Sequence, residues 1–434
     1  MTESRVTFTR EMALDYHLGG KIALGILKPL RNDIDLSLAY TPGVAEVCRL
    51  IEGDPDRVFT HTARKNTVAV VTDGTAVLGL GDIGPEASIP VMEGKAVLFK
   101  AFADVDAWPV PLAGVRANGD SGRSNPDAFV ETVARLAVMY GGINIEDVAA
   151  PECFEIEDRL REMLDIPVFH DDQHGTAIIS LAGLENYLLL TGKRIGDISI
   201  VINGGGAAGI RIGELFRHAG ATRILMCDSK GIIHEGRGDL NPLKALFAAR
   251  TECRSLEDAM RGADVFIGVS RPRLVTREMV RSMAPNPAVF AMANPEPEIM
   301  PEEVQAARDD AYIATGRSDY PNQINNVLGF PFIFRGTLDV RATDITVNMK
   351  LGCAKALAEL AREDAPDYIS RAYGDVRLAF GREYLIPKPF DRRVFVRASA
   401  AVAEAAISDG VARNPLDIAD YRAALERKAE RLGG

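Results

Sequence analysis

Short runs of β-branched and other apolar residues alternate with longer helical patterns along this 434-residue chain. Alternation of this kind is typical of α/β folds built on parallel sheets. A helical pattern from near Gly175 to Thr191 separates two groups of strand-like runs. The expected strands are 67–72, 96–101, 143–147 and 166–170 in the first group, and 198–203, 223–228, 263–270, 288–294 and 311–315 in the second. We therefore expect two parallel-sheet domains that meet near this helix.

The length allows two or three domains, and the two groups of strands account for two of them. We place an N-terminal domain at residues 1–175 and a second domain at residues 176–376. From about residue 345 onward the sequence is typical of helices, as in 350–362 and 394–408.

Composition and charge exclude several classes of protein. The chain is 47% hydrophobic and 26% charged, as in ordinary globular proteins, and its net charge of −11 disfavours a general nucleic-acid or membrane-surface binder. No run approaches the roughly 18 apolar residues of a membrane span, and residues 1–16 lack the apolar core of a signal peptide. Five scattered cysteines without a C-x-x-C pair argue against a disulfide framework. We expect a cytoplasmic protein.

A glycine-rich turn, Gly204-Gly205-Gly206-Ala207-Ala208-Gly209, follows an apolar strand and opens a helix. The next strand ends at Asp228, 19 residues after Gly209. In a Rossmann-type unit, such glycines let the backbone approach a pyrophosphate, and the acidic residue bonds the adenosine ribose. Ser229 and Lys230 follow Asp228 and could accommodate a 2′-phosphate, so both NAD and NADP stay open. The alternative is a tight turn without a ligand.

Polar residues also end the other strands of this domain, where ligands bind in open parallel sheets. Asn294 is the most suggestive of them, because it lies in a rigid Met-Ala-Asn-Pro-Glu-Pro segment. We expect it at the cofactor. An ordinary turn asparagine is the alternative.

Acidic pairs end two strands of the first domain. Glu146 and Asp147 close the run 143–147, and Asp171 and Asp172 follow the run 166–170. If both strands finish at one sheet edge, Glu146, Asp147 and Asp172 converge and need a cation, for which an all-oxygen set suits Mg²⁺ or Mn²⁺. A zinc site using the nearby histidines is the weaker hypothesis, and a solvated turn with Asp as the N-cap is the structural alternative.

Two more residues of the first domain are candidates for proton transfer. Lys95 precedes the run 96–101, which we interpret as a strand. A lysine in this position usually extends to the surface. Beside a dication, however, its pKa would be lowered and it could act as a base. Tyr40 precedes a Pro-Gly helix entry, and packing against that helix is its alternative role.

Taken together, these motifs resemble the malic enzyme family in its shorter bacterial form, without the acetyltransferase-like extension of longer relatives. The resemblance runs in order through nearly the whole chain, at 38–45, 71–85, 90–110, 143–157, 167–177, 202–212, 292–299, 315–339 and 386–393. It implies oxidative decarboxylation of (S)-malate to pyruvate and CO₂ with reduction of NAD(P)⁺, and decarboxylation of oxaloacetate as a partial reaction. A catalytically silent metabolite sensor on the same fold is the alternative from another class.

The resemblance also implies roles for residues. By the family pattern, Tyr40 is the general acid and Lys95 the general base and a substrate contact. Glu146, Asp147 and Asp172 match the metal ligands, with Asp171 in the proton-transfer network. The remaining matches, which would hold malate and the nicotinamide end of the cofactor, are Asn294, Asn325 and Asn326.

The chain departs from the larger family members at one position. Ala76 stands where they carry an arginine for a substrate carboxylate, so the resemblance does not identify this clamp. It does imply a homodimer or larger homo-oligomer, with N-terminal helices exchanged between subunits, and C-terminal helices 377–434 that rejoin the first domain.

Overall fold

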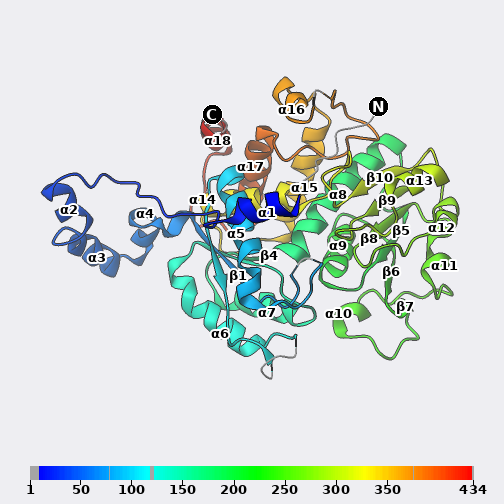
Figure 1. The fold of residues 1–434 in the computed structure, drawn as a ribbon, viewed down its shortest axis with the longest axis horizontal. Helices are drawn as coiled ribbons and strands as arrows, with labels where there is room; N and C mark the ends of the chain where they lie inside the picture. The colour runs from blue at the N-terminus through cyan, green and yellow to red at the C-terminus, as the bar shows by residue number, and fades with distance from the viewer. Residues whose placement is uncertain (1–8, 78, 118–121, 375, 433–434) are drawn as a thin grey trace.

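The computed structural model describes residues 9–77, 79–117, 122–374 and 376–432 and contains two sheets (Figure 1). The first sheet is parallel, with strand order β2-β1-β3-β4. Its strands are β1 (Thr67–Thr72), β2 (Asp106–Pro111), β3 (Gly142–Ile145) and β4 (Val168–His170). Strands β1, β3 and β4 lie within or at the expected runs, which confirms the α/β class for this half.

The second sheet has the strand order β10-β9-β8-β5-β6-β7. Its strands are β5 (Ser199–Asn203), β6 (Arg223–Asp228), β7 (Gly231–Ile232), β8 (Val265–Gly268), β9 (Ala288–Ala291) and β10 (Tyr312–Thr315). The short β7 pairs antiparallel to β6, and the other pairings are parallel. This is a Rossmann-type order. The order in which successive strands are added to the sheet reverses between β5 and β8, and this reversal leaves a crevice for a ligand.

The helices surround these sheets and extend beyond them. They are α1 (Arg10–His17), α2 (Asp33–Ala39), α3 (Val44–Gly53), α4 (Val58–His61), α5 (Gly84–Ala103), α6 (Pro126–Leu136), α7 (Glu152–Met163), α8 (Asp171–Thr191), α9 (Ala207–His218), α10 (Pro242–Ala245), α11 (Leu256–Met260), α12 (Arg277–Arg281), α13 (Pro301–Ala307), α14 (Phe330–Asp339), α15 (Val347–Ala361), α16 (Asp367–Ala372), α17 (Arg392–Ser408) and α18 (Ile418–Leu432). None of the helices that the structure describes is both long enough and apolar enough to cross a bilayer.

One expected strand is wrong. Residues 96–101 belong to α5, whose buried side chains Met92, Ala96, Phe99 and Ala103 recur at the three- and four-residue spacing of a helix. The short apolar run within this pattern also fits a buried strand, and that ambiguity caused the error. The fourth strand of the sheet is instead β2, which the sequence does not suggest because it contains two prolines. It lies at the edge of the sheet, where proline is tolerated.

Helix α8 joins the two halves of the molecule. It begins directly after β4, and its middle is buried on nearly every side, with α9 and α15 packed against it. Near its C-terminal end, the hydroxyl of Tyr187 donates a hydrogen bond to the carbonyl of Asn286 beside the second sheet, at 2.8 Å. Gly192, with φ 66°, ends the helix in the left-handed conformation that favours glycine.

The chain returns to the first sheet after β10. The ring of Phe330 on α14 lies 4.7 Å from that of Phe99 on α5, and the ring of Phe334 lies 6.0 Å from that of Phe169 on β4. Helix α17 then packs on α14 and α15 (Figure 1). The return therefore begins at α14, before residue 377.

Residues 24–53, which we call the N-terminal arm, carry α2 and α3 away from the rest of the chain (Figure 1). Every residue of the arm is exposed or half-buried. The exposed side chains include many large apolar ones: Leu24, Ile26, Leu27, Leu30, Ile34, Leu36, Leu38, Tyr40, Val44 and Leu50. Exposed apolar side chains gathered on one segment are typical of an interface with another protein.

Candidate active site

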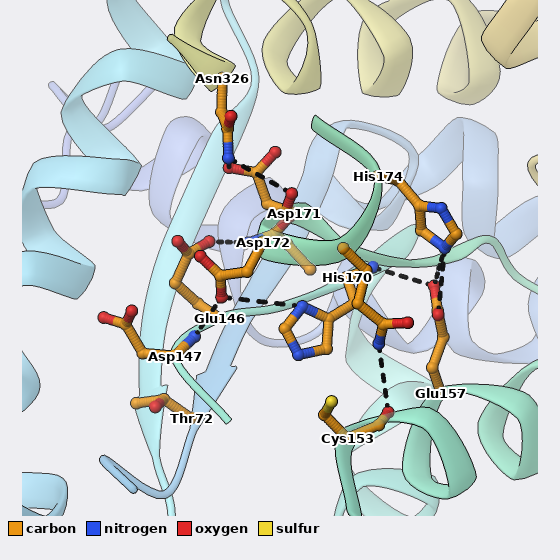
Figure 2. A network of polar contacts seen from close by, with 12 residues as sticks. Thr72, Glu146, Asp147, Cys153, Glu157, His170, Asp171, Asp172, His174 and Asn326 are labelled. Atoms are coloured by element: carbon orange, nitrogen blue, oxygen red, sulfur yellow. Dashed lines mark hydrogen bonds and ion pairs between the residues drawn. The ribbon is translucent and has the colours of Figure 1, made fainter. Parts of the chain in front are cut away.

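Four carboxylates meet at one edge of the first sheet. Strands β3 and β4 run in parallel with Ile145 opposite His170, so the residues that follow each strand emerge together. Glu146 and Asp147 follow β3, while Asp171 and Asp172 form the first turn of α8. Figure 2 shows these side chains close to one another. The predicted convergence is therefore present.

Backbone contacts hold this edge in place. Asp147 has a left-handed φ of 55°, which aspartate tolerates better than most residues. Its N–H donates to Oδ2 of Asp172 at 2.8 Å, and its carbonyl accepts from the N–H of Ala76 at 3.0 Å. The hydroxyl of Thr75 accepts from the N–H of Ala149 at 2.9 Å. The turn after β1 thus fixes the loop that carries the acidic pair.

Lys95 reaches the carboxylates from α5. Its Nζ lies 2.6 Å from Oδ2 of Asp171 and 2.9 Å from Oε1 of Glu146, and it sits 4.4 Å from the centre of the Phe330 ring. Burial alone lowers the pKa of Lys95, but the negative charges of Asp171, Glu146 and Asp172 outweigh it and raise the pKa. Without another cation in the cluster, the lysine is an ammonium.

The carboxylates have more negative charge than this one ammonium balances. Burial raises the pKa of Glu146 well above its usual range; Lys95 opposes the shift, while Asp172, Asp171 and Asp147 add to it. Burial likewise raises the pKa of Asp171, against the opposing effect of Lys95. Such a site favours the entry of a further cation.

The donors suit a hard dication. One oxygen each from Glu146, Asp147 and Asp172 lie within 4.8 Å of one another, and within the described part of the chain they form the one such group of three. Oxygens around an octahedral Mg²⁺ lie about 3 to 4 Å apart, so small carboxylate rotations close the site. Neither nearby histidine joins the group; the Nε2 atom of His174 lies 2.8 Å from Glu157 instead.

Asn326 links the carboxylates to the segment before α14. Its Nδ2 donates to Oδ2 of Asp171 at 3.2 Å, and its Oδ1 accepts from the Thr176 hydroxyl at 2.9 Å. Asn325 is half-buried and its Oδ1 accepts from the N–H of Val327 at 3.0 Å, which starts a 3₁₀ turn over Asn326–Leu328. The pair predicted to hold substrate therefore flanks the site, with Asn326 in direct contact.

A cleft of about 750 Å³ opens above the second sheet. Its wall includes Gly204, Gly206, Asp228 and Ser229 from the predicted dinucleotide motif. A Cβ on Gly209 would collide with the carbonyl oxygen of Gly204, so glycine is required for this turn. Ala207 and Ala208 start α9, whose N–H groups are available to a phosphate. The expected nucleotide site is thus a preformed cleft beside the β5–β8 crevice.

Asn294 follows β9 and is exposed. If Gly79 carried a Cβ, that atom would lie 3.0 Å from the carbonyl oxygen of Asn294, and a Cβ on Gly316 would lie 2.8 Å from Nδ2 of Asn294. Both glycines therefore lie close to Asn294. Asn294 therefore sits where a loop of the first domain meets the second.

Tyr40 is not brought to these residues within one chain. It ends α2 on the N-terminal arm, with 70% of its surface exposed. Within the single chain, Lys95, the carboxylates and Asn326 therefore lie together. Tyr40, the candidate acid, lies apart from them on the N-terminal arm.

Some residues around the site had no sequence signal. Arg237 and Lys244 both pair with Asp228, from 9 and 16 residues further along the chain. Below the first turn of α8, Lys350 lies 3.1 Å from Nδ1 of His174, whose Nε2 bonds Glu157. Lysine and arginine in loops or helices are too common for spacing alone to identify them.

Comparison with known proteins gives matches over most of the chain. The family model "Malic enzyme, N-terminal domain" matches residues 20–161, and "Malic enzyme, NAD binding domain" matches residues 173–370. The NADP-dependent malic enzyme of Halomonas elongata is 52% identical over 411 residues, which cover 94% of this chain and 95% of that protein. The NADP-dependent malic enzyme of Escherichia coli K12 is 50% identical over 428 residues, covering 97% of this chain and 55% of its own length.

Several curated relatives are, like the E. coli enzyme, about twice as long as the part that this chain spans. Among solved structures, the malic enzyme of Pyrococcus horikoshii superimposes with a TM-score of 0.86 at 41% identity. The match covers 97% of this chain and 96% of that one.

Proposed function

Because this chain belongs to the malic enzyme family, we propose that it catalyses the oxidative decarboxylation of (S)-malate to pyruvate and CO₂ with reduction of NAD(P)⁺. Decarboxylation of oxaloacetate is the second half of the same reaction. The observation that carries the proposal is Lys95, whose Nζ lies within 2.9 Å of both Asp171 and Glu146 at an edge that offers three metal-binding carboxylates.

Glu146, Asp147 and Asp172 would hold Mg²⁺ or Mn²⁺. When bound, the dication polarises the substrate oxygen at C2, and the nicotinamide accepts the hydride. Oxidation precedes decarboxylation because only the β-keto acid readily loses its C4 carboxylate.

Lys95 would take the proton of the C2 hydroxyl. Two of the three negative charges that raise its pKa belong to metal-ligand candidates, Glu146 and Asp172. Once those charges are neutralised, the burial that lowers the pKa of Lys95 is opposed by Asp171 alone, and a neutral amine becomes accessible. Asp171 accepts a hydrogen bond from this amine and orients it, while Asn326 holds Asp171. Asn294 and Asn325 would hold malate and the nicotinamide end.

Tyr40 would protonate C3 of the enol, and for this it has to come from another subunit. The N-terminal arm projects from the rest of the chain and exposes many large apolar side chains, as expected of a segment that packs on a second copy. We propose a homodimer, or a larger oligomer of dimers, in which the arms are exchanged. The five cysteines are all free thiols, which supports a cytoplasmic enzyme.

The first domain is proposed as residues 1–175 together with the C-terminal helices, around the second domain that starts at 176. The packing of α14 on α5 supports a return to the first domain near residue 330, earlier than the 377 expected from the sequence.

One spectrophotometric assay tests the activity. With malate and Mn²⁺, NADPH or NADH should form together with an equal amount of pyruvate. Lactate formed without net reduction would indicate a malolactic reaction, and the absence of any product with either cofactor would favour the catalytically silent alternative.

Complementation tests the exchanged arm. Tyr40→Phe and Lys95→Ala should each be inactive alone, whereas co-expression should restore about a quarter of wild-type activity, because half of the dimers are mixed and each has one intact site. Mixed dimers that form but stay inactive would contradict exchange.

A further inference from the structure

A second cavity, of about 110 Å³, lies among α7, α8, α9 and the start of α15. It shares no lining residue with the cleft above the second sheet, and neither Lys95 nor any of the four clustered carboxylates lines it. Pockets for drug- or cofactor-sized molecules measure about 300 to 1,000 Å³, so this cavity suits a much smaller ligand.

The wall of this cavity carries three cations and one carboxylate. The cations are Arg161, Arg211 and Lys350, and the carboxylate is Glu214. His174 also lines it, and burial lowers the pKa of this histidine to about 3 against the opposing effect of Glu157, so the ring is neutral. A wall with this excess of positive groups attracts an anion.

Lys350 is only 7% exposed, and its ammonium keeps unused donors. Its Nζ lies 3.1 Å from Nδ1 of His174, while Nε2 of the same ring bonds Glu157 (Figure 2). An ammonium has three N–H donors, and Nδ1 accepts one of them. Among the described residues, nothing accepts from the other two. A buried cation in this position is costly unless a further ligand accepts from it.

The two arginines are held in place by part of their donors and keep others unused. Nε and Nη2 of Arg161 bond Asp344 at 2.9 and 2.8 Å. Nε of Arg211 bonds Gln173 and its Nη1 bonds Glu214, both at 2.8 Å. Nη1 of Arg161 and Nη2 of Arg211 have no acceptor within hydrogen-bond distance in the described part of the chain. Each guanidinium is therefore fixed and still able to bind a ligand.

The carboxylates behind the wall do not neutralise Lys350. Glu157 contacts it only through the ring of His174, and Asp344 is bonded by Arg161. Burial, together with the charges of Arg161 and Arg211, lowers the pKa of Lys350 against the opposing effects of Glu157 and Asp344. The ammonium thus has room for a counter-ion of its own.

We propose that this cavity binds one inorganic phosphate, held by Nζ of Lys350, Nη1 of Arg161 and Nη2 of Arg211. These donors come from three helices, α15, α7 and α9, and therefore suit a tetrahedral anion better than a planar carboxylate. Guanidinium groups bind phosphate oxygens through strong, charge-assisted hydrogen bonds. The site is separate from the proposed catalytic residues and does not depend on the proposed function.

The bound anion would join α7, α9 and α15 around α8. Because phosphate would bind the folded protein and not the unfolded chain, it should raise the Tm. Lys350→Met should lose this rise, whereas Lys355→Met should keep it. Lys355 is the matched control, since it lies on the same helix and its side chain is 69% exposed.

Calorimetry at constant ionic strength measures the site directly. NADPH is added first, because the N-terminus of α9 in the nucleotide cleft could also bind phosphate. The wild type and Lys355→Met should then bind one phosphate per chain, with a Kd of about 1 mM or lower. Lys350→Met should bind it at least about tenfold more weakly, because a hydrogen bond from a charged donor is lost.

Glu214→Gln gives a test with the opposite sign. The substitution removes the one carboxylate of the wall, while the amide oxygen can still accept from Arg211. Phosphate should bind this variant about 3- to 10-fold more tightly than the wild type.

Three results would overturn the proposal. They are the absence of saturable phosphate binding by the wild type up to about 10 mM, equal phosphate affinity of Lys350→Met and the wild type, and unchanged or weaker binding by Glu214→Gln. Fumarate that binds this site while phosphate does not would overturn it as well, since the cavity would then prefer a planar dicarboxylate.

Discussion

Nζ of Lys95 and Oδ2 of Asp171 lie 2.6 Å apart, although the two residues come from different helices. The contact joins the proposed proton acceptor to the carboxylate that would orient it. Asp171 begins α8 and Lys95 lies in the middle of α5, so the relative position of these two helices determines where the amine points.

Replacing Lys95 should therefore remove catalysis while leaving cofactor binding. Loss of a general base costs about 10²- to 10⁴-fold in rate, so kcat of Lys95→Ala should fall by at least that range. Lys95→Arg should not recover activity, because a guanidinium stays charged. NADPH fluorescence titration should give an affinity close to that of the wild type.

Lys100→Ala provides the control for that substitution. Lys100 lies on the same helix, but it is exposed and pairs with Asp104 and Asp106. Its kcat should be unchanged. Normal turnover by Lys95→Ala would remove the lysine from the proton-transfer step.

The proposed metal ligands can be tested by Mn²⁺ binding. Glu146→Gln and Asp172→Asn each replace a carboxylate by an isosteric amide, which is a poor ligand for a hard dication. Calorimetry should show Mn²⁺ affinity reduced by about tenfold or more in each variant. Glu155→Gln, at an exposed site on α7 that pairs with Arg159, should bind Mn²⁺ as the wild type does.

Chelation gives a second readout for the same site. Because Mn²⁺ binds the folded protein, saturating metal should raise the Tm and EDTA should reverse the rise. The shift should be absent in Asp172→Asn; a shift of wild-type size in that variant would place the metal elsewhere.

Two glycines of the dinucleotide turn should respond differently to alanine. At Gly209 the added Cβ would collide with the carbonyl oxygen of Gly204, so Gly209→Ala should destabilise the fold by about 1 to 3 kcal/mol. No described atom lies within 4 Å of a Cβ on Gly206. Gly206→Ala should keep its Tm and lose cofactor affinity, since the methyl group occupies the approach of the pyrophosphate.

Thermal denaturation and NADPH titration distinguish the two outcomes. A Gly206→Ala protein with unaltered NADPH affinity would show that the pyrophosphate does not approach this part of the turn.

Lys350 predicts a dependence of stability on pH. Burial, together with the charges of Arg161 and Arg211, lowers its pKa from 10.5 to about 8, against the opposing effect of Glu157. Between these two values the unfolded chain binds the proton more strongly than the folded one, so the contribution of Lys350 to stability rises with pH. Burial of the charged Lys350 destabilises the fold most below about pH 8, and this destabilisation has disappeared above about pH 10.5.

Comparison with Lys350→Met isolates this contribution. Urea denaturation at about pH 7.5 and about pH 9.5 should show the free energy of unfolding of the wild type rising by about 2 kcal/mol relative to that of the variant. Lys355→Met on the same helix, whose lysine is largely exposed, should track the wild type at both pH values. If the difference in free energy of unfolding between wild type and Lys350→Met were the same at both pH values, Lys350 would not titrate between them.

The convergence of the carboxylates could be predicted because it follows from strand direction. Glu146, Asp147 and Asp172 come directly after neighbouring parallel strands, and such strand ends must lie together. The dinucleotide turn was predictable for a similar reason, since its glycines and Asp228 belong to one continuous strand–helix–strand unit.

Contacts between separate elements could not be predicted in this way. The sequence selects Lys95 as a candidate but assigns the run 96–101, which follows it, to a strand, because a six-residue apolar run has the same composition in a strand and in a buried helix. Lys244 and Arg237 reach Asp228 across loops, and only the folded chain shows that they do. The exposure of Tyr40 became evident only with the path of the N-terminal arm.

Helix α8 runs as one continuous helix from the first sheet toward the second. Its first turn carries Asp171 and Asp172, and its far end is anchored beside the second sheet through Tyr187. The carboxylates at one end of the helix and the contact with the second sheet near its other end therefore belong to one continuous element, which determines how far Asp171 and Asp172 lie from the second sheet.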